Sequence, residues 1–265
     1  MSGEPLKILW LSTSNDNRAN LAEGARRPEL MAKMLEAEIS HAVTLVTKPI
    51  WPSEELPEII EKWLEREQPD IVWFSTAAYW FTYESVPLRL KNRFGRVGEK
   101  VSGAGITAGK DPRFANSATF RLVRRALQLT IGGDTQLTPE QVVERQTKNA
   151  RTIARHEHIV LILEGPRGRT NFSASKRSAA RAERKRLFVH RKLRDLAAEL
   201  RAGYCGSDET LRAVVGEFRT QKDKFHMDET GHETSAALDF PTLLEAVKNA
   251  GLDSLSDSFR GKLRR

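Results

Sequence analysis

The run Lys7-Ile8-Leu9-Trp10-Leu11 is the first apolar segment of the chain, and it stops at the polar stretch Ser12-Thr13-Ser14-Asn15-Asp16-Asn17. A short, uninterrupted apolar run is typical of a strand that is buried on both faces in a parallel sheet. Small polar residues directly after such a run suit a turn and the N-terminal cap of a helix. The two segments therefore predict a buried strand with a polar turn at its carboxyl end.

The same strand pattern recurs along the chain and alternates with segments of helical periodicity. Apolar runs at residues 42–46 and 71–74 follow segments 21–37 and 56–64, in which apolar side chains repeat at helical spacing. The run at 158–163 is the most apolar of the chain. Alternating strands and helices are typical of a parallel sheet with crossover helices. We predict an α/β fold: a flavodoxin-like three-layer α/β/α sandwich with a central, mostly parallel sheet of about five strands.

The length of 265 residues suffices for one sizeable α/β core. No internal repeat or linker divides the chain, so we expect a single domain over residues 1–265, with a core at roughly 6–250 and a polar, basic tail at 254–265. Residues 211–215 fit either a short fifth strand or a helical turn.

The N-terminus has no recognisable signal, and no apolar run approaches the roughly 18 residues of a membrane span. We therefore expect a cytoplasmic protein.

Basic residues are in excess, with 43 Lys and Arg against 35 Asp and Glu, which gives a net charge of +8. The segment Ser175–Arg194 concentrates them, and its only acid is Glu183. Helical spacing of its apolar residues and those just beyond predicts one buried face and one charged face. A solvated helix face is the simpler interpretation, and nucleic acid or an acidic lipid surface is the alternative partner of Lys176–Arg194. No recognition helix or aromatic-interleaved RNA surface is present, and the oligomeric state is open.

The sequence has few residues that could form a disulfide or bind a metal ion. The single Cys205 excludes an intramolecular disulfide and a cysteine-based metal site. His226 and His232 lie six residues apart with acids between them, but no third ligand cluster accompanies them. We expect no metal and no cofactor.

Two polar or aromatic segments follow predicted strands, where sites in parallel α/β sheets lie. One is Ser12–Asn17, and the other is Ser75–Ser85. The second holds the aromatic residues Tyr79, Trp80, Phe81 and Tyr83. They fit either a loop packed on the core or the wall of a pocket for an apolar or sugar-like ligand. Residues 91–115, rich in Gly, Pro and basic residues, predict a long loop or lid beside it.

A late stretch, Asp223-Lys224-Phe225-His226-Met227-Asp228-Glu229-Thr230-Gly231-His232, holds two of the six histidines, each close to carboxylates. A carboxylate three residues before a histidine is a compact way to build the base half of a nucleophilic site. The carboxylate orients the imidazole, and the other ring nitrogen faces the nucleophile. Asp and His are also common in loops and helix caps, so the spacing alone does not choose between the two histidines.

The order of these segments resembles the SGNH (GDSL-type) hydrolases over roughly residues 6–250. In that family a serine follows the first strand in a Gly-Asp-Ser turn, and Ser14 stands at this place. Pro69-Asp70-Ile71-Val72 matches the run that introduces the family's third motif block. The family's C-terminal Asp-x-x-His, continued by Gly-His, matches Asp223–His226 with Gly231-His232.

The resemblance implies a role for each matched residue. Ser14 would be the nucleophile, His226 the base and Asp223 its orienting acid. His232 would mark the start of the last helix, and the resemblance leaves capping and surface roles for it and for Asp228 and Glu229.

Three departures from the family pattern concern the first, second and third motif blocks. Ser12 and Thr13 stand where the family has glycine and aspartate, and no glycine lies near Thr47–Pro49. Ala77–Trp80 replaces the third block's asparagine, a donor to the oxyanion. Loss of one such donor costs on the order of 10²–10³ in turnover. Asn15, Tyr79 or a backbone N–H could take its place.

The function that follows is a serine ester hydrolase acting on a small-molecule, sugar or lipid ester through an acyl-enzyme on Ser14. Asn15 and Tyr79 would help to hold the oxyanion, and Trp80 and Tyr83 would shape the substrate pocket. The alternatives are a catalytically weak or inactive SGNH-like protein that binds a ligand or partner and, less favoured, a nucleic-acid-binding protein.

Overall fold

The computed structural model describes the backbone of residues 4–17, 21–86, 88–93, 122, 126, 133–167, 175–206 and 227–253. The chain forms two compact units. Unit 1 comprises Met1–Thr76, Val143–Arg167 and His190–Arg265, and unit 2 comprises Ala77–Val142 and Gly168–Val189. The expectation of a single domain over residues 1–265 stays a prediction.

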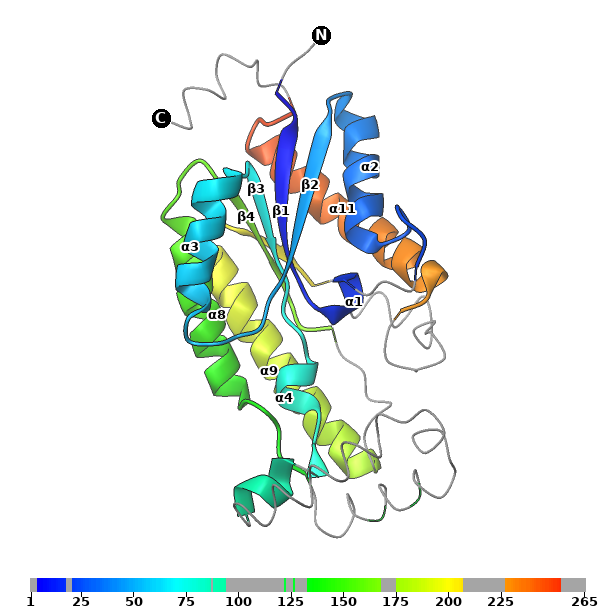
Figure 1. The fold of residues 1–265 in the computed structure, drawn as a ribbon, viewed down its shortest axis with the longest axis vertical. Helices are drawn as coiled ribbons and strands as arrows, with labels where there is room; N and C mark the ends of the chain where they lie inside the picture. Colours follow the sequence, from blue (N-terminus) through cyan, green and yellow to red (C-terminus); the bar gives the residue numbers. More distant parts are fainter. Residues whose placement is uncertain are drawn as a thin grey trace. The chain divides into compact units, whose positions relative to one another are not determined.

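Unit 1 contains a five-stranded parallel sheet in the order β2-β1-β3-β4-β5 (Figure 1). Its strands are β1 (Leu6–Ser12), β2 (Val43–Pro49), β3 (Ile71–Phe74), β4 (Val160–Glu164) and β5 (Gly203–Cys205). Helices on both sides complete a three-layer α/β/α sandwich, which confirms the predicted fold class.

The helices divide between the two faces of the sheet (Figure 1). Helices α2 (Arg27–Ile39) and α11 (Glu229–Asn249) pack together on one face. The opposite face carries α3 (Leu56–Glu67), α8 (Pro139–Ala154) and the C-terminal part of α9 (Lys176–Leu200). An apolar core lies between the sheet and helices α2 and α11, and in it the indole rings of Trp10 and Trp73 stack at a centroid distance of 4.6 Å.

The fifth strand lies elsewhere than the sequence suggested. It is Gly203–Cys205, paired with β4, whereas residues 211–215 lie outside the described ranges. Three residues are too few to show an apolar pattern, so this strand could not be recognised from its residues alone. The backbone of Gly203 lies close to β4, because a Cβ there would approach the Ile162 side chain to 3.2 Å, and that side chain would have to shift by a few tenths of an ångström.

Unit 2 contains the aromatic segment. Its short helix α4 (Tyr79–Thr82) buries Trp80 and Phe81, and the Trp80 carbonyl accepts a hydrogen bond from Leu137 N–H. The rings of Tyr79 and Tyr83 stack on each other at a centroid distance of 4.8 Å. Of the predicted loop 91–115, residues 91–93 are helical and the remainder lies outside the described ranges.

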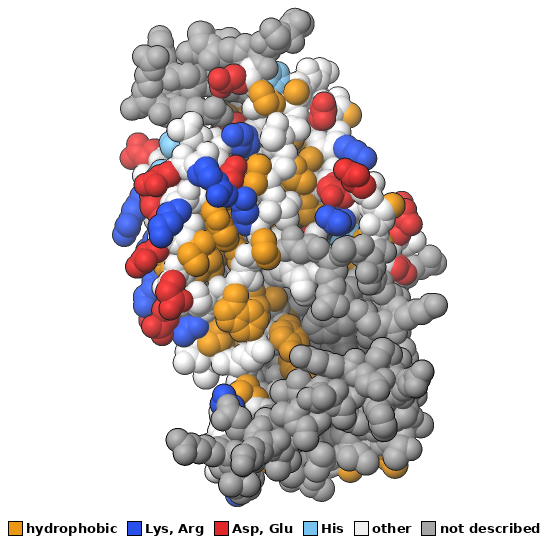
Figure 2. All heavy atoms as spheres, viewed as in Figure 1, with side chains coloured by type: hydrophobic (Ala, Val, Ile, Leu, Met, Phe, Trp, Pro, Cys, Tyr) orange, Lys and Arg blue, Asp and Glu red, His pale blue; other side chains and the backbone are white. Residues whose placement is uncertain are grey.

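The surface of one face carries both charge signs. Figure 2 shows basic and acidic side chains interleaved over the side where Figure 1 places α3 and α8. Among the described residues, no helix combines the length and the hydropathy that a membrane span needs.

Candidate active site at the carboxyl edge of the sheet

Ser14 lies at the carboxyl edge of the sheet, where β1 ends. It is the first residue of the short helix α1 (Ser14–Asn17), and it is exposed. The strand end before it is anchored: Ser12 is buried, its Oγ donates to the Lys48 carbonyl at 3.0 Å, and its carbonyl accepts from Ile50 N–H at 2.9 Å. A fixed strand end thus presents an exposed serine hydroxyl at the edge where parallel α/β proteins bind ligands.

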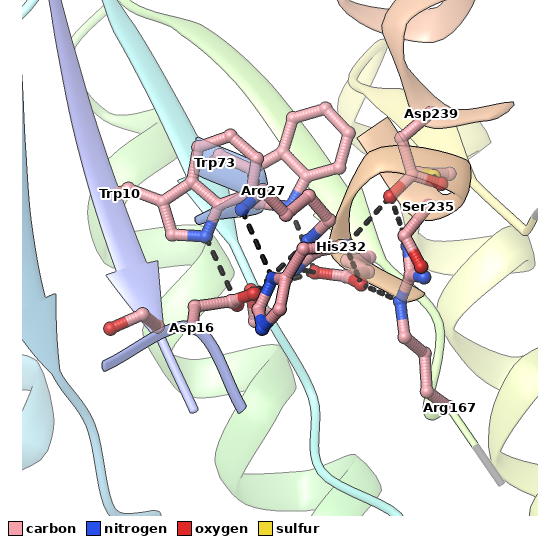
Figure 3. A network of polar contacts seen from close by, with 12 residues as sticks. Trp10, Asp16, Arg27, Trp73, Arg167, His232, Ser235 and Asp239 are labelled. Atoms are coloured by element: carbon pink, nitrogen blue, oxygen red, sulfur yellow. Dashed lines mark hydrogen bonds and ion pairs between the residues drawn. The ribbon is translucent and has the colours of Figure 1, made fainter. Parts of the chain in front are cut away.

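A buried arginine organises the charged groups beneath this edge (Figure 3). Arg27, the first residue of α2, is 1% exposed. Its Nε and Nη2 donate to Asp16 at 3.0 and 2.7 Å, and its Nη1 and Nη2 donate to Glu164 at 2.6 and 3.0 Å. Its Nη1 also donates to Asp239 at 2.7 Å. These five hydrogen bonds match the five N–H groups of a guanidinium, so the side chain is fully paired.

Glu164, the last residue of β4, is the acceptor that joins this cluster to the sheet. Trp73 Nε1 and Ser75 Oγ both donate to its Oε2, at 2.8 and 2.7 Å. Arg167 donates from Nε to Glu164 at 2.5 Å and from Nη2 to Asp239. The stacked indoles of Trp10 and Trp73 lie against the Arg27 guanidinium, 5.1 and 5.9 Å from its central carbon. Two guanidinium groups and three carboxyl groups therefore share one buried site.

The shifted pKa values follow from this arrangement. Burial alone would raise the pKa of Glu164, but the positive charges of Arg27 and Arg167 outweigh burial and hold it well below its ordinary value. Burial alone would lower the pKa of Arg27, whereas the charges of Asp16, Glu164 and Asp239 raise it far above its usual value. The ion pair between Arg27 and Glu164 therefore persists across the physiological pH range.

His232 belongs to the same buried site. It lies in the first turns of α11, is 1% exposed, and accepts a hydrogen bond at Nδ1 from the backbone N–H of Arg27 at 3.1 Å (Figure 3). Burial, together with the charges of Arg27 and Arg167, lowers its pKa to about 4, although Asp16 acts in the opposite direction. His232 is therefore neutral at pH 7, with its proton on Nε2. The surface role expected for His232 is wrong, because its side chain is buried where α11 packs against the start of α2.

The start of α11 confirms the other part of that expectation. Asp228 is the N-cap of the helix, and its side chain accepts from Gly231 N–H at 2.8 Å. Glu229 is exposed in the first turn. The preceding Met227 is buried, and its sulfur accepts from Ser235 Oγ at 3.3 Å.

The remaining predicted site residues are placed as follows. Asp223 and His226 lie outside the described residues, so their distance to Ser14 stays a prediction, and only the backbone of Asn15 is described. Tyr79 and Tyr83 are partly exposed in unit 2, and Trp80 is buried there, as the core-packing alternative expects.

Sequence reasoning missed Arg27, Asp16, Glu164, Arg167 and Asp239. The partners of Arg27 are 11, 137 and 212 residues away, so no local spacing reveals them. Two weak signals were present. Asp16 lies in the turn after the first strand, and Glu164 ends the most apolar strand of the chain.

Solved structures with this fold include several esterases. The structure of TesA matches with a TM-score of 0.53 at 14% identity, covering 91% of this chain and 99% of that one. An acetyl xylan esterase, AlAXEase, matches with a TM-score of 0.51 at 10% identity, covering 89% and 99%. AlinE4, described as an SGNH-hydrolase family esterase, matches with a TM-score of 0.50 at 15% identity, covering 97% and 100%.

Comparison of the sequence alone finds nothing: no protein-family model and no curated protein matches it. The likeness thus lies in the arrangement of strands and helices, which extends over nearly the whole length of these neighbours. The protein has the fold of the SGNH hydrolases.

Proposed function

We propose that the protein is a serine ester hydrolase in which Ser14 is the nucleophile, His226 the general base and Asp223 the acid that orients it. The observation that carries the proposal is the place of Ser14. It is an exposed serine, two residues past the end of β1, at the carboxyl edge of a fold that the esterases AlinE4 and AlAXEase share.

The proposed reaction has two halves. His226 takes the proton of Ser14 Oγ as the oxygen attacks the ester carbonyl, and the same proton then leaves with the alcohol, which gives an acyl-enzyme. A water molecule attacks the acyl group while His226 removes its proton. The proton returns to Ser14 as the acid is released. The backbone N–H of Ser14, helped by Asn15 or Tyr79, would hold the oxyanion.

The hydrogen bonding of His232 supports the choice of His226 as base. A general base needs an unoccupied nitrogen lone pair facing the nucleophile. The only lone pair of neutral His232 lies on Nδ1, which accepts the N–H of Arg27. A pKa of about 4 also leaves this imidazole a weak base near neutral pH. Of the two histidines in the stretch 223–232, His226 is the one that this argument leaves available.

The proposed substrate is a small-molecule, sugar or lipid ester. We expect wild-type protein to hydrolyse p-nitrophenyl acetate and butyrate, and to be labelled on Ser14 by a fluorophosphonate. Ser14→Ala and His226→Ala should both lose at least about 10³-fold in kcat/KM. Ser53→Ala and His156→Ala are the matched controls, because Ser53 lies in the loop after β2 and the partly exposed His156 pairs with Glu61. Equal rates in all five proteins would rule the mechanism out.

A second candidate is an inactive SGNH-like protein that binds a ligand or partner at the same edge. The observation in its favour is the absence of the oxyanion asparagine, for which Ala77–Trp80 stands. Such a protein would show no labelling of Ser14 and no difference in ester hydrolysis between wild type and Ser14→Ala.

A further inference from the structure

We propose that Arg27 is a positioning residue, which fixes the turn that carries Ser14 against the helix that follows His226. The proposal rests on the proposed function and goes beyond it, because it assigns a role to a residue outside the proposed triad of Ser14, His226 and Asp223.

Arg27 joins the two elements that carry the proposed catalytic groups. On one side it binds Asp16, two residues after Ser14, through two hydrogen bonds. On the other side it binds α11 twice, through its side chain to Asp239 and through its backbone N–H to His232. His232 and Asp239 are seven residues apart, which places them on the same face of the helix.

Helix α1 depends on this anchor for its position. It has four residues, far fewer than an isolated helix needs to be stable in water. Among its described side chains, Asp16 is the buried one, and it is held by Arg27 and by Trp10 Nε1, at 3.4 Å. The orientation of Ser14 at the start of α1 is therefore coupled to the carboxylate of Asp16.

Arg27 itself has little freedom to move. All five of its N–H groups are donated, and the bidentate pairs with Asp16 and Glu164 fix the plane of the guanidinium as well as its location. The stacked indoles of Trp10 and Trp73 lie against it. A shift of α1 relative to α11 would therefore break charged hydrogen bonds in a buried site, where they are strong.

His226 is connected to the same frame through the chain. It is bonded directly to Met227, whose side chain is buried, and Asp228 then caps α11. Ser14 thus lies on an element that Arg27 binds, and α11, which Arg27 also binds, begins three residues after His226 in the chain. Because a misplacement of about 1 Å can cost on the order of 10²-fold in rate, loosening the frame should slow the chemical step.

The experiment compares Asp16→Asn and Arg27→Lys with wild type and with Arg186→Lys. Asp16→Asn removes only the α1 anchor and one negative charge from a site with three carboxyl and two guanidinium groups, so the fold should tolerate it. Arg27→Lys keeps the charge and loses the two-pronged geometry. Arg186 is a matched control, because it is also buried and forms a bidentate pair, with Glu183 of its own helix.

We expect kcat for p-nitrophenyl butyrate to fall by about 30- to 100-fold in Asp16→Asn and Arg27→Lys, with KM changed less than about threefold. The rate of fluorophosphonate labelling of Ser14 should fall in parallel. Arg186→Lys should lose thermal stability without losing kcat, which separates positioning from stability.

Wild-type kcat in a folded Asp16→Asn protein, measured well below its melting temperature, would overturn the proposal. A loss of kcat in Arg186→Lys equal to that in Arg27→Lys would overturn it as well. A wild-type protein that neither hydrolyses esters nor labels would instead refute the proposed function, so the two failures are distinct.

Discussion

Two regions of this protein concentrate charge, and they do so in opposite ways. In the Arg27 cluster (Asp16, Arg27, Glu164, Arg167 and Asp239), the charged groups are buried and bonded to one another. In helix α9, most of the basic side chains point to solvent. There Arg181 forms a partly exposed ion pair with Glu84, and Arg194 lies over the Tyr204 ring.

The difference between the two regions shows that a charged side chain affects stability mainly when it is buried. A long run of one sign in a helix is tolerated because water solvates it, and exposed pairs contribute about 0–1 kcal/mol. Burial makes the effect on stability larger, because a buried charge that loses its partner destabilises the protein by about 3–5 kcal/mol. Among the described residues, the basic side chains that stand out most in the sequence therefore lie on the exposed face of α9, where each contributes little to stability.

The largest test of this comparison replaces the central guanidinium. Arg27→Met should reduce the free energy of unfolding by about 3–5 kcal/mol, because Arg167 alone would then face three carboxyl groups. Arg184→Met, an exposed change on α9, should shift it by no more than about 0.5 kcal/mol. Urea denaturation followed by tryptophan fluorescence measures both. If the two variants lost unfolding free energy equally, within about 1 kcal/mol, buried and exposed charges would contribute alike to stability and the comparison would fail.

The pH dependence of stability is a second test of burial in the cluster. The pKa of His232 in the folded protein is about 4, below the ordinary histidine value of 6.5. As pH falls, the unfolded chain therefore takes up the proton first, and stability present above pH 6.5 is lost between pH 6.5 and pH 4. The full loss is about 3 kcal/mol, of which about 2 kcal/mol should appear by pH 5.

His232→Asn isolates this effect, because an amide oxygen can still accept the Arg27 N–H while the side chain no longer titrates. Urea denaturation at pH 7.5 and pH 5 should show a loss of stability that is smaller in the variant by about 2 kcal/mol. Identical pH dependence in both proteins would mean that His232 is not desolvated as the structure indicates.

The sequence predicted the sheet well because its signals are local. Strands β1, β3 and β4 are largely apolar runs, as burial on both faces requires, whereas the edge strand β2 is only partly buried. The cap of α11 was predictable for the same reason, since Asp228 bonds a residue three positions away. The short β5 has no such pattern, and its pairing with β4 is what defines it.

The Arg27 cluster could not be predicted, because nothing near Arg27 in sequence distinguishes it from the other basic residues. Its position at the start of α2 fits an ordinary helix residue, and its partners come from α1, β4 and α11. His232 was misplaced for the same reason. Its burial results from packing against α2, more than 200 residues earlier in the chain.

A third, smaller test concerns the hydroxyl that binds Glu164. Ser75→Ala should cost about 1–3 kcal/mol, since Ser75 is buried and donates to a charged acceptor. Thr234→Ala provides the contrast, because this exposed hydroxyl donates to the neutral carbonyl of Thr230, and its loss should cost no more than about 0.5 kcal/mol. If Ser75→Ala and Thr234→Ala lost equal stability in thermal or urea denaturation, the hydrogen bond from Ser75 to Glu164 would contribute no more than an exposed one.

The smallest expected effect lies in α9, at the ion pair between Arg181 and Glu84. Its atoms are 3.2 Å apart, but the Arg181 side chain is 45% exposed, so water and salt screen the attraction. A double-mutant cycle of Arg181→Ala and Glu84→Ala should give a coupling energy of about 0.2–1 kcal/mol that shrinks further in 1 M NaCl. The pair is also looser than the buried ones, because one nitrogen, Arg181 Nη2, donates to both Glu84 oxygens at 3.2 and 3.5 Å. A salt-insensitive coupling above about 2 kcal/mol would show that α9 holds its charges as the Arg27 cluster does, and the contrast between the regions would fail.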